Sequence, residues 1–199
     1  WWAVLSSALG AFLAILDIQI TNASLREIQG AFGLDYLEVG WISTAYLIAE
    51  VAVIPLTSAA SKALGVGRCL FWNGAGFLGA STLCGFAWSF ESLVLFRVIQ
   101  GFTGGALVPL SFQTILLRMP PSQRTVGMAI FGITATLAPT LGPTVGGILT
   151  DEWGWRSTFF VNLLPGMLML WGVRKGFREV PILWKKLREL DTVGALSLG

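Results

Sequence analysis

Three ionisable side chains, Asp17, Glu50 and Arg97, interrupt apolar runs that are each long enough to cross a bilayer. A charged side chain at bilayer depth costs about 2.5 to 3.5 kcal/mol on insertion scales, and such residues serve substrate pathways or proton relays. A carboxylate can take up and release a proton, and an arginine can pair with its charged form. The three residues therefore predict a transport function.

The composition predicts that helices crossing a membrane position these residues. The chain has 199 residues, of which 54% are hydrophobic and 12% charged, too apolar for a soluble domain. A hydrocarbon core of about 30 Å requires about 20 apolar residues as helix. We expect six helices, near residues 2–25, 39–61, 69–89, 93–117, 126–149 and 157–174.

The loops between these helices differ in basic charge. Lys and Arg number ten in the even loops and two in the odd loops, and Arg97 is the thirteenth. By the positive-inside rule the even loops and the N-terminus are cytoplasmic. The net charge of +2 then reflects topology, and we expect no nucleic-acid partner.

The chain begins at Trp1 without an initiating Met and ends at Gly199, where a new apolar segment starts. We expect the N-terminal half of a larger protein. Its predicted parts are a transmembrane bundle over 1–174, a cytoplasmic amphipathic linker over 175–192, and the truncated start of another membrane helix over 193–199.

The depths of the charged residues predict which of them meet. At 1.5 Å per residue, Asp17 lies about 12 Å and Arg97 about 6 Å from the outer ends of their helices, whereas Glu50 lies about 16 Å deep. Asp17 and Arg97 are therefore expected to pair across a cavity. The alternative is a buried ion pair that only fixes helix packing.

Polar residues share helical faces with these charges. Tyr46 lies on the face of Glu50, and both Gln100 and Gly101 lie on the face of Arg97. Polar stripes on apolar helices face protein or water, so we assign Glu50, Gln100 and Tyr46 to substrate binding.

Glycines and prolines gather in the fifth predicted helix, at Gly142, Pro143, Gly146 and Gly147. In a bilayer such a run makes a kinked helix with a flat face that a neighbouring helix can approach closely. The expected role of the run is a packing seam.

Together these segments resemble the major facilitator superfamily, specifically its drug:proton antiporter branch with fourteen helices. Residues 142–147 look like its antiporter motif. Residues 93–105 resemble its helix-four motif, in which the arginine is associated with proton coupling, and Leu16 and Asp17 resemble its helix-one motif. Residues 155–166 are similar to the start of helix six, whereas residues 58–68 lack the usual Gly and Asp.

The resemblance implies an all-α membrane protein, the six-helix N-terminal half of a major facilitator fold with 3+3 inverted repeats. It implies a secondary transporter of the bacterial inner membrane that exports lipophilic or cationic compounds against entering protons. Asp17 and Arg97 would couple the protons, and Gly101 would let helices close around Arg97. The proton gradient would supply the energy, without cofactor or metal.

The expected partners are a small-molecule substrate, protons and the lipid bilayer, with a periplasmic adaptor and an outer-membrane channel as further candidates. Two alternatives remain open: an uptake symporter for a sugar or organic acid, and a non-transporting scaffold. An enzyme is not expected, because the chain has no histidine and its intramembrane carboxylates are unpaired with each other.

Overall fold

The computed structural model describes residues 1–177, and all the regular structure in this range is helical. The predicted linker and the start of a further membrane helix fall almost wholly outside the described residues. The elements are α1 (Trp2–Phe32), α2 (Tyr36–Leu64), α3 (Val66–Gly85), α4 (Phe90–Gly104), α5 (Leu107–Arg118), η1 (Pro121–Gln123), α6 (Arg124–Trp153), α7 (Ser157–Phe160) and α8 (Leu163–Gly176).

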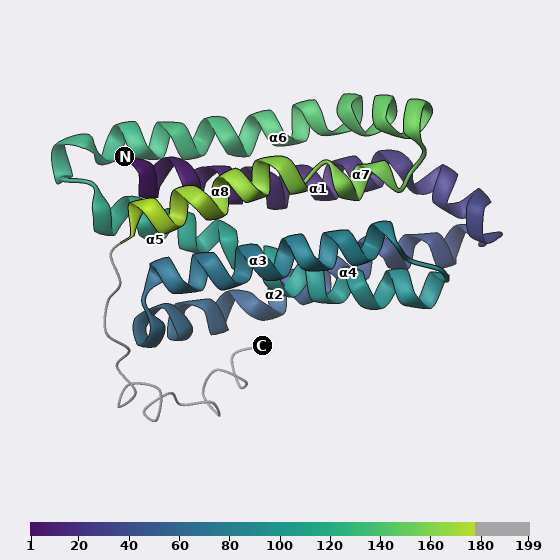
Figure 1. Cartoon of the computed structure of the whole chain (residues 1–199), viewed down its shortest axis with the longest axis horizontal. Coiled ribbons are helices and arrows are strands. Elements are labelled where there is room, and N and C mark those ends of the chain that lie inside the picture. The colour runs from purple at the N-terminus through teal and green to yellow at the C-terminus, as the bar shows by residue number, and fades with distance from the viewer. Residues whose placement is uncertain (178–199) are drawn as a thin grey trace.

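Over residues 1–177 these elements form a bundle of six roughly parallel rods, and successive rods alternate in direction (Figure 1). The helices α4 and α5 make up the fourth rod, and α7 and α8 make up the sixth. The structure therefore confirms an all-α fold built from the six predicted segments. Within the described residues, four helical stretches are long and apolar enough to cross a membrane: Trp2–Phe32, Tyr36–Leu64, Phe90–Arg118 and Pro121–Trp153.

The other two rods fall short of that criterion for identifiable reasons. In α3 the residues Arg68 and Asn73 and several glycines reduce the mean hydropathy, and the sixth rod is divided into two shorter helices. Both nevertheless lie alongside the long helices in the bundle (Figure 1).

The first helix extends seven residues beyond its predicted end and stops at Gly33, whose φ of 65° is the left-handed conformation that favours glycine. The next helix begins directly afterwards. Asp35 accepts a hydrogen bond from the backbone N–H of Glu38, and the Glu38 side chain accepts from the backbone N–H of Asp35. This capping box fixes the start of α2.

The helices of the fourth and sixth rods are interrupted, whereas we predicted one continuous helix in each place. The interruptions lie at Gly105–Ala106 and at Val161–Asn162. Each begins four residues before a proline, Pro109 or Pro165, because proline has no N–H to donate to the carbonyl four residues earlier. Backbone torsions stay near helical values at both places, with φ between −58° and −71°.

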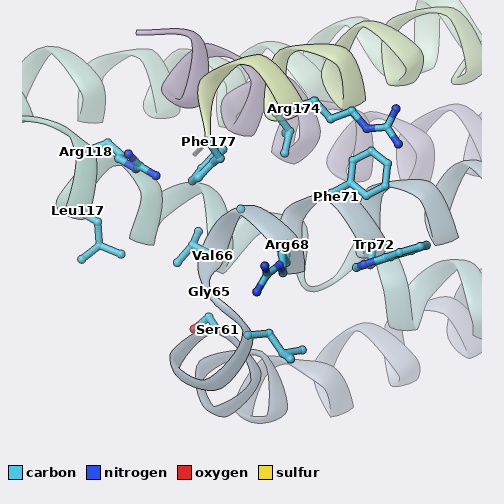
Figure 2. Close-up of a pocket in the computed structure, with 13 residues that line it drawn as sticks. Ser61, Gly65, Val66, Arg68, Phe71, Trp72, Leu117, Arg118, Arg174 and Phe177 are labelled. Atoms are coloured by element: carbon cyan, nitrogen blue, oxygen red, sulfur yellow. The ribbon is translucent and has the colours of Figure 1, made fainter. Parts of the chain in front are cut away.

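One end of the bundle holds a cavity of about 490 Å³ between the α2–α3 connection and the last turns of α5 and α8 (Figure 2). Arg118 and Arg174 approach its aromatic wall, with guanidinium carbons 4.8 Å and 4.5 Å from the ring centroids of Phe177 and Phe71. Arg68 also lines it. This cavity lies apart from the intramembrane charges.

Candidate functional site

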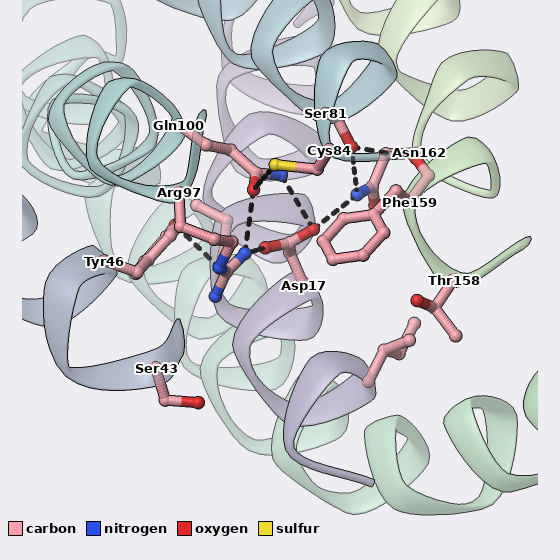
Figure 3. A network of polar contacts seen from close by, with 12 residues as sticks. Asp17, Ser43, Tyr46, Ser81, Cys84, Arg97, Gln100, Thr158, Phe159 and Asn162 are labelled. Atoms are coloured by element: carbon pink, nitrogen blue, oxygen red, sulfur yellow. Dashed lines mark hydrogen bonds and ion pairs between the residues drawn. The ribbon is translucent and has the colours of Figure 1, made fainter. Parts of the chain in front are cut away.

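Asp17 lies near the middle of α1 and is 0% exposed. Its carboxylate accepts hydrogen bonds from Arg97 Nη1 at 2.5 Å, Gln100 Nε2 at 2.9 Å and Asn162 Nδ2 at 2.6 Å (Figure 3). The donors come from the fourth and sixth rods. The predicted pairing of Asp17 with Arg97 is confirmed, and this is the one ion pair between residues 1–177.

Arg97 is also fully buried and has further contacts besides Asp17. Its Nη1 donates to Gln100 Oε1 at 2.8 Å, and its Nε donates to the backbone carbonyl of Ile42 at 3.3 Å. The guanidinium carbon lies 4.2 Å from the ring centroid of Tyr46, a distance at which a cation–π attraction is significant. The guanidinium is thus held by α2 and α4 as well as by α1.

Close helix contact surrounds this arginine. A Cβ atom on Gly101 would collide with the backbone carbonyl of Tyr46, and one on Gly104 would lie 2.7 Å from the Tyr46 hydroxyl. The structure therefore places Gly101 where α4 touches α2, next to Arg97. A larger side chain there would push the two helices apart.

The three residues assigned to substrate binding are separated in the structure. Tyr46 and Gln100 are both 0% exposed and belong to the network around Asp17 and Arg97. In this arrangement neither has a free surface for a ligand. Glu50, one turn further along α2, instead lines a separate cavity.

The Glu50 cavity has a volume of about 410 Å³ and lies at the interruption between α4 and α5. At Gly105 the chain packs closely against α2, because a Cβ atom there would lie 2.8 Å from the Cα atom of Glu50. The walls are mainly apolar and include two phenylalanines, Phe112 and Phe131, whose ring centroids lie 6.3 Å apart. The remaining lining residues are Ile54, Val108, Pro109 and Gln113.

The predicted packing seam lies between α6 and α1 but involves only part of the motif. Cβ atoms on Gly142 and Gly146 would collide with Gln19 and with the Ile20 backbone. In contrast, Pro143 is exposed, and a Cβ atom on Gly147 would meet no atom of residues 1–177 within 4 Å. Among residues 1–177, Pro143 and Gly147 thus lie outside the contact between α6 and α1, since residues one position apart on a helix point about 100° away from each other.

The seam continues towards the end of α6 through a polar contact. The hydroxyls of Ser24 and Thr150 lie 2.7 Å apart, and both side chains are buried. Thr150 lies one turn beyond Gly146, so Gly142, Gly146 and Thr150 follow each other at intervals of four residues on a single helix face.

Our sequence analysis did not include Asn162 in the site. The search was for charged residues in apolar runs, and a single amide near a helix start did not stand out. Asn162 also donates to Ser81 Oγ at 3.0 Å, and Cys84 Sγ lies 3.6 Å from Gln100 Oε1. The third rod therefore borders the network as well. Within residues 1–177 no group of His, Cys, Asp or Glu is arranged to hold a metal.

Comparisons with known proteins agree with this architecture. A family model described as Major Facilitator Superfamily matches residues 7–191. The chain is 40% identical over 169 residues to the colistin resistance protein EmrB of Acinetobacter baumannii, covering 84% of this chain and 33% of the relative. It is 35% identical to the fatty acid resistance protein FarB of Neisseria gonorrhoeae and 33% identical to the multidrug export protein EmrB of Escherichia coli K12, covering 96% of this chain and 36% or 37% of the relative.

Solved structures share the fold at low identity. The proton:xylose symporter XylE superposes with a TM-score of 0.78 at 16% identity, over 98% of this chain and 47% of the symporter. The peptide transporter POT gives 0.75 at 17% identity, over 98% of this chain and 44% of that transporter. The chain spans about a third of the length of its curated relatives, and its apolar helices together with these matches show a multi-pass membrane protein. The family match over nearly the whole chain shows that it belongs to the Major Facilitator Superfamily.

Proposed function

We propose that this chain is the N-terminal part of a secondary transporter that exports lipophilic or cationic compounds from a bacterial cell in exchange for entering protons. The observation that carries the proposal is the buried Asp17 carboxylate and its three donors from two other rods. The names of the relatives, which include multidrug export and resistance proteins, support the same direction of transport.

The geometry suggests how a proton could control helix contacts. While Asp17 is charged, its ion pair with Arg97 links α1 to α4, and removing one partner from a buried pair would leave the other charge uncompensated. Uptake of a proton by Asp17 removes that attraction. Arg97 then keeps its contacts with Gln100, Ile42 and Tyr46, so the guanidinium is not left without partners when the link to α1 opens.

The Glu50 cavity supports a lipophilic cation as the transported compound. Its apolar and aromatic walls would cover a hydrophobic body, and one carboxylate would supply the charge complement. Glu50 has no ion-pair partner among residues 1–177, which leaves its charge available to a ligand. Changing Glu50→Gln in the full-length transporter should weaken binding of a cationic substrate about tenfold or more and leave a neutral substrate within about twofold. Equal effects on both would contradict this role.

The proposed topology places the N-terminus in the cytoplasm of a bacterial cell and the protein in its inner membrane, on the basis of the basic loops. The six rods would form the bundle over 1–174, followed by a cytoplasmic linker over 175–192 and a further membrane helix from 193. A periplasmic adaptor and an outer-membrane channel would complete the export path. No cofactor is required in this scheme, because the proton gradient supplies the energy.

The test is transport by the full-length protein in proteoliposomes. A pH gradient should drive substrate accumulation by the native protein, whereas Asp17→Asn and Arg97→Ala should lose at least about 90% of that drive. Asp151→Asn is the control, because it removes an exposed carboxylate at the end of α6. Full gradient-driven transport by Asp17→Asn would refute the coupling role. Movement of the substrate in the same direction as the protons would support an uptake symporter instead. The absence of any substrate flux would support a non-transporting scaffold.

A further inference from the structure

Asn162 connects three rods through its side-chain amide. The residue lies in the interruption between α7 and α8 and is 0% exposed. Its Nδ2 donates to Asp17 Oδ1 on α1 at 2.6 Å and to Ser81 Oγ on α3 at 3.0 Å (Figure 3). Ser81 in turn donates to the backbone carbonyl of Phe159 at 2.8 Å. The amide thus joins the Asp17 carboxylate to the sixth rod.

The other end of this amide has no partner. Asn162 Oδ1 is buried and accepts no hydrogen bond from residues 1–177, although buried side-chain oxygens are usually paired. An amide can present either its nitrogen as a donor or its oxygen as an acceptor to the same neighbour. The Asn162 oxygen can therefore accept a hydrogen bond. The charged Asp17 carboxylate has no hydrogen to donate to it.

Gln100 does not have this freedom. Its Nε2 also donates to Asp17, but its Oε1 accepts from Arg97 Nη1 at 2.8 Å. Turning the Gln100 amide over would place its nitrogen against the guanidinium and lose that bond. The other titratable or charged side chains around Asp17 are Arg97 from α4, Tyr46 from α2 and Cys84 from α3. Glu50 follows Tyr46 one turn further along α2. None of these is an amide with an unused oxygen.

We propose that Asn162 reads the protonation state of Asp17 and transmits it to the sixth rod, an inference that rests on the proposed proton exchange at Asp17. When Asp17 is charged, Asn162 donates to it through Nδ2. When Asp17 gains a proton on Oδ1, the new O–H becomes a donor, and the amide turns over so that Asn162 Oδ1 accepts from it. The 2.6 Å separation between the two residues is ordinary for an O–H···O bond.

The turned amide has a consequence for the helix that carries it. Its nitrogen moves away from Asp17 and Ser81 and is left as a buried donor without an acceptor, which is unfavourable. A small movement of the sixth rod relieves this. The interruption at Val161–Asn162 can absorb such a movement, because Pro165 has already removed the helical hydrogen bond there. Protonation of Asp17 thereby favours a different position of α7 and α8.

The experiment compares two substitutions in the full-length transporter. Asn162→Leu is similar in size and can neither donate nor accept, and Asn162→Asp keeps the shape but only accepts when charged. Asn73→Leu is the matched control, because Asn73 is a part-buried asparagine on α3 whose amide donates within its own helix, to Cys69. Two fluxes are measured in proteoliposomes: accumulation driven by a pH gradient, and substrate exchange at equal pH on both sides.

With Asn162→Leu we expect gradient-driven accumulation to fall about tenfold or more, because the variant loses a hydrogen bond to a charged group. Substrate exchange at equal pH should stay within about twofold of the native rate. Asn73→Leu should change neither flux. If Asn162→Leu keeps its gradient drive, or if both fluxes fall equally, Asn162 is not a reader of protonation. If Asp17→Asn also keeps the drive, the proposed function fails; if Asp17→Asn alone loses it, only the present inference fails.

A spectroscopic measurement adds a test that does not depend on flux. The infrared C=O band of the protonated carboxylic acid, assigned to Asp17 by its absence in Asp17→Asn, gives the pH at which that residue is half protonated. Because Asn162 serves both forms of Asp17, Asn162→Leu should move this pH by less than about one unit, whereas Asn162→Asp should raise it by more than about one unit. An upward move of more than one unit in Asn162→Leu would mean that Asn162 holds only the charged form, and would overturn the proposal.

Discussion

The neighbouring glycines Gly146 and Gly147 offer a stringent test of the α1–α6 seam. Both belong to the same turn of α6, yet only Gly146 faces α1. A Cβ atom at Gly146 would lie 2.8 Å from the backbone oxygen of Ile20 and 2.9 Å from both Ile20 Cα and Ala23 Cβ. A Cβ atom at Gly147 would meet nothing within 4 Å in the part of the chain that the structure describes. We therefore expect Gly146→Ala to destabilise the protein and Gly147→Ala not to do so.

The size of the difference follows from these contacts. Ordinary heavy-atom contacts are about 3.5 to 4.0 Å, so α6 must retreat from the Ile20 backbone by about 0.7 Å to admit a methyl group at position 146. Overpacking of this kind typically costs about 1 to 3 kcal/mol. Both substitutions gain the same helix propensity, which cancels in the comparison. If the retreat also breaks the contact between Ser24 and Thr150, about 1 kcal/mol more is lost.

The assay is equilibrium unfolding of the full-length protein in mixed micelles, with the free energies of unfolding of the two variants compared directly. Gly146→Ala should be less stable than Gly147→Ala by about 1 to 4 kcal/mol. Equal stability of the two variants would refute the packing argument, because it would mean that α1 does not closely approach the Gly146 face. A lower stability of Gly147→Ala would show that the seam lies on the other face of α6.

Three further outcomes are expected. Gly101→Ala should reduce both stability and transport, because its methyl group would collide with the backbone carbonyl of Tyr46, and disulfide trapping between α2 and α4 should report the wider spacing. Ser24→Ala and Thr150→Ala should show a coupling free energy of about 0.5 to 1.5 kcal/mol in a double-mutant cycle of unfolding, whereas additive effects would exclude the hydrogen bond. Arg97→Lys should retain less than about a tenth of gradient-driven transport, because one ammonium group cannot reproduce the hydrogen bonds that Nη1 donates to Asp17 and Gln100 together with the one that Nε donates to the Ile42 carbonyl.

The pairing of Asp17 with Arg97 could be predicted because depth along a helix depends only on the rise per residue and an approximate helix end. The error of seven residues at the end of α1 is only partly offset at α4, which begins three residues earlier than expected, at Phe90. With the observed helix ends, the depths of Asp17 and Arg97 differ by about 12 Å instead of about 6 Å, so the predicted depths agreed better than the observed helix ends do. The interruptions could also have been predicted, from Pro109 and Pro165. Those prolines were visible in the sequence, but we treated each apolar run as one continuous helix.

Other features depend on which neighbour each helix face meets, and a single sequence does not contain that information. Gly146 and Gly147 look equivalent in the sequence, and only the position of α1 distinguishes them. The assignment of Gln100 to substrate binding also depended on an unknown neighbour. The helical face of Gln100 was identified correctly, but in the structure that face meets Asp17 and not the Glu50 cavity. Asn162 is brought to Asp17 by the packing of the last rod against the first, which local patterns do not encode.

The sequence separation of the Asp17 donors has a consequence for biogenesis. Arg97 follows Asp17 by 80 residues and Asn162 follows it by 145, so the ribosome has not yet made either donor when the first helix reaches the membrane. At about 5 to 20 residues per second, the 65 residues from Arg97 to Asn162 take about 3 to 13 s to synthesise. During nascent-chain insertion Asp17 is first without these partners and can then bind Arg97. Its set of donors is complete only after the sixth segment, which carries Asn162, emerges. The order of translation therefore sets the order in which the polar centre assembles.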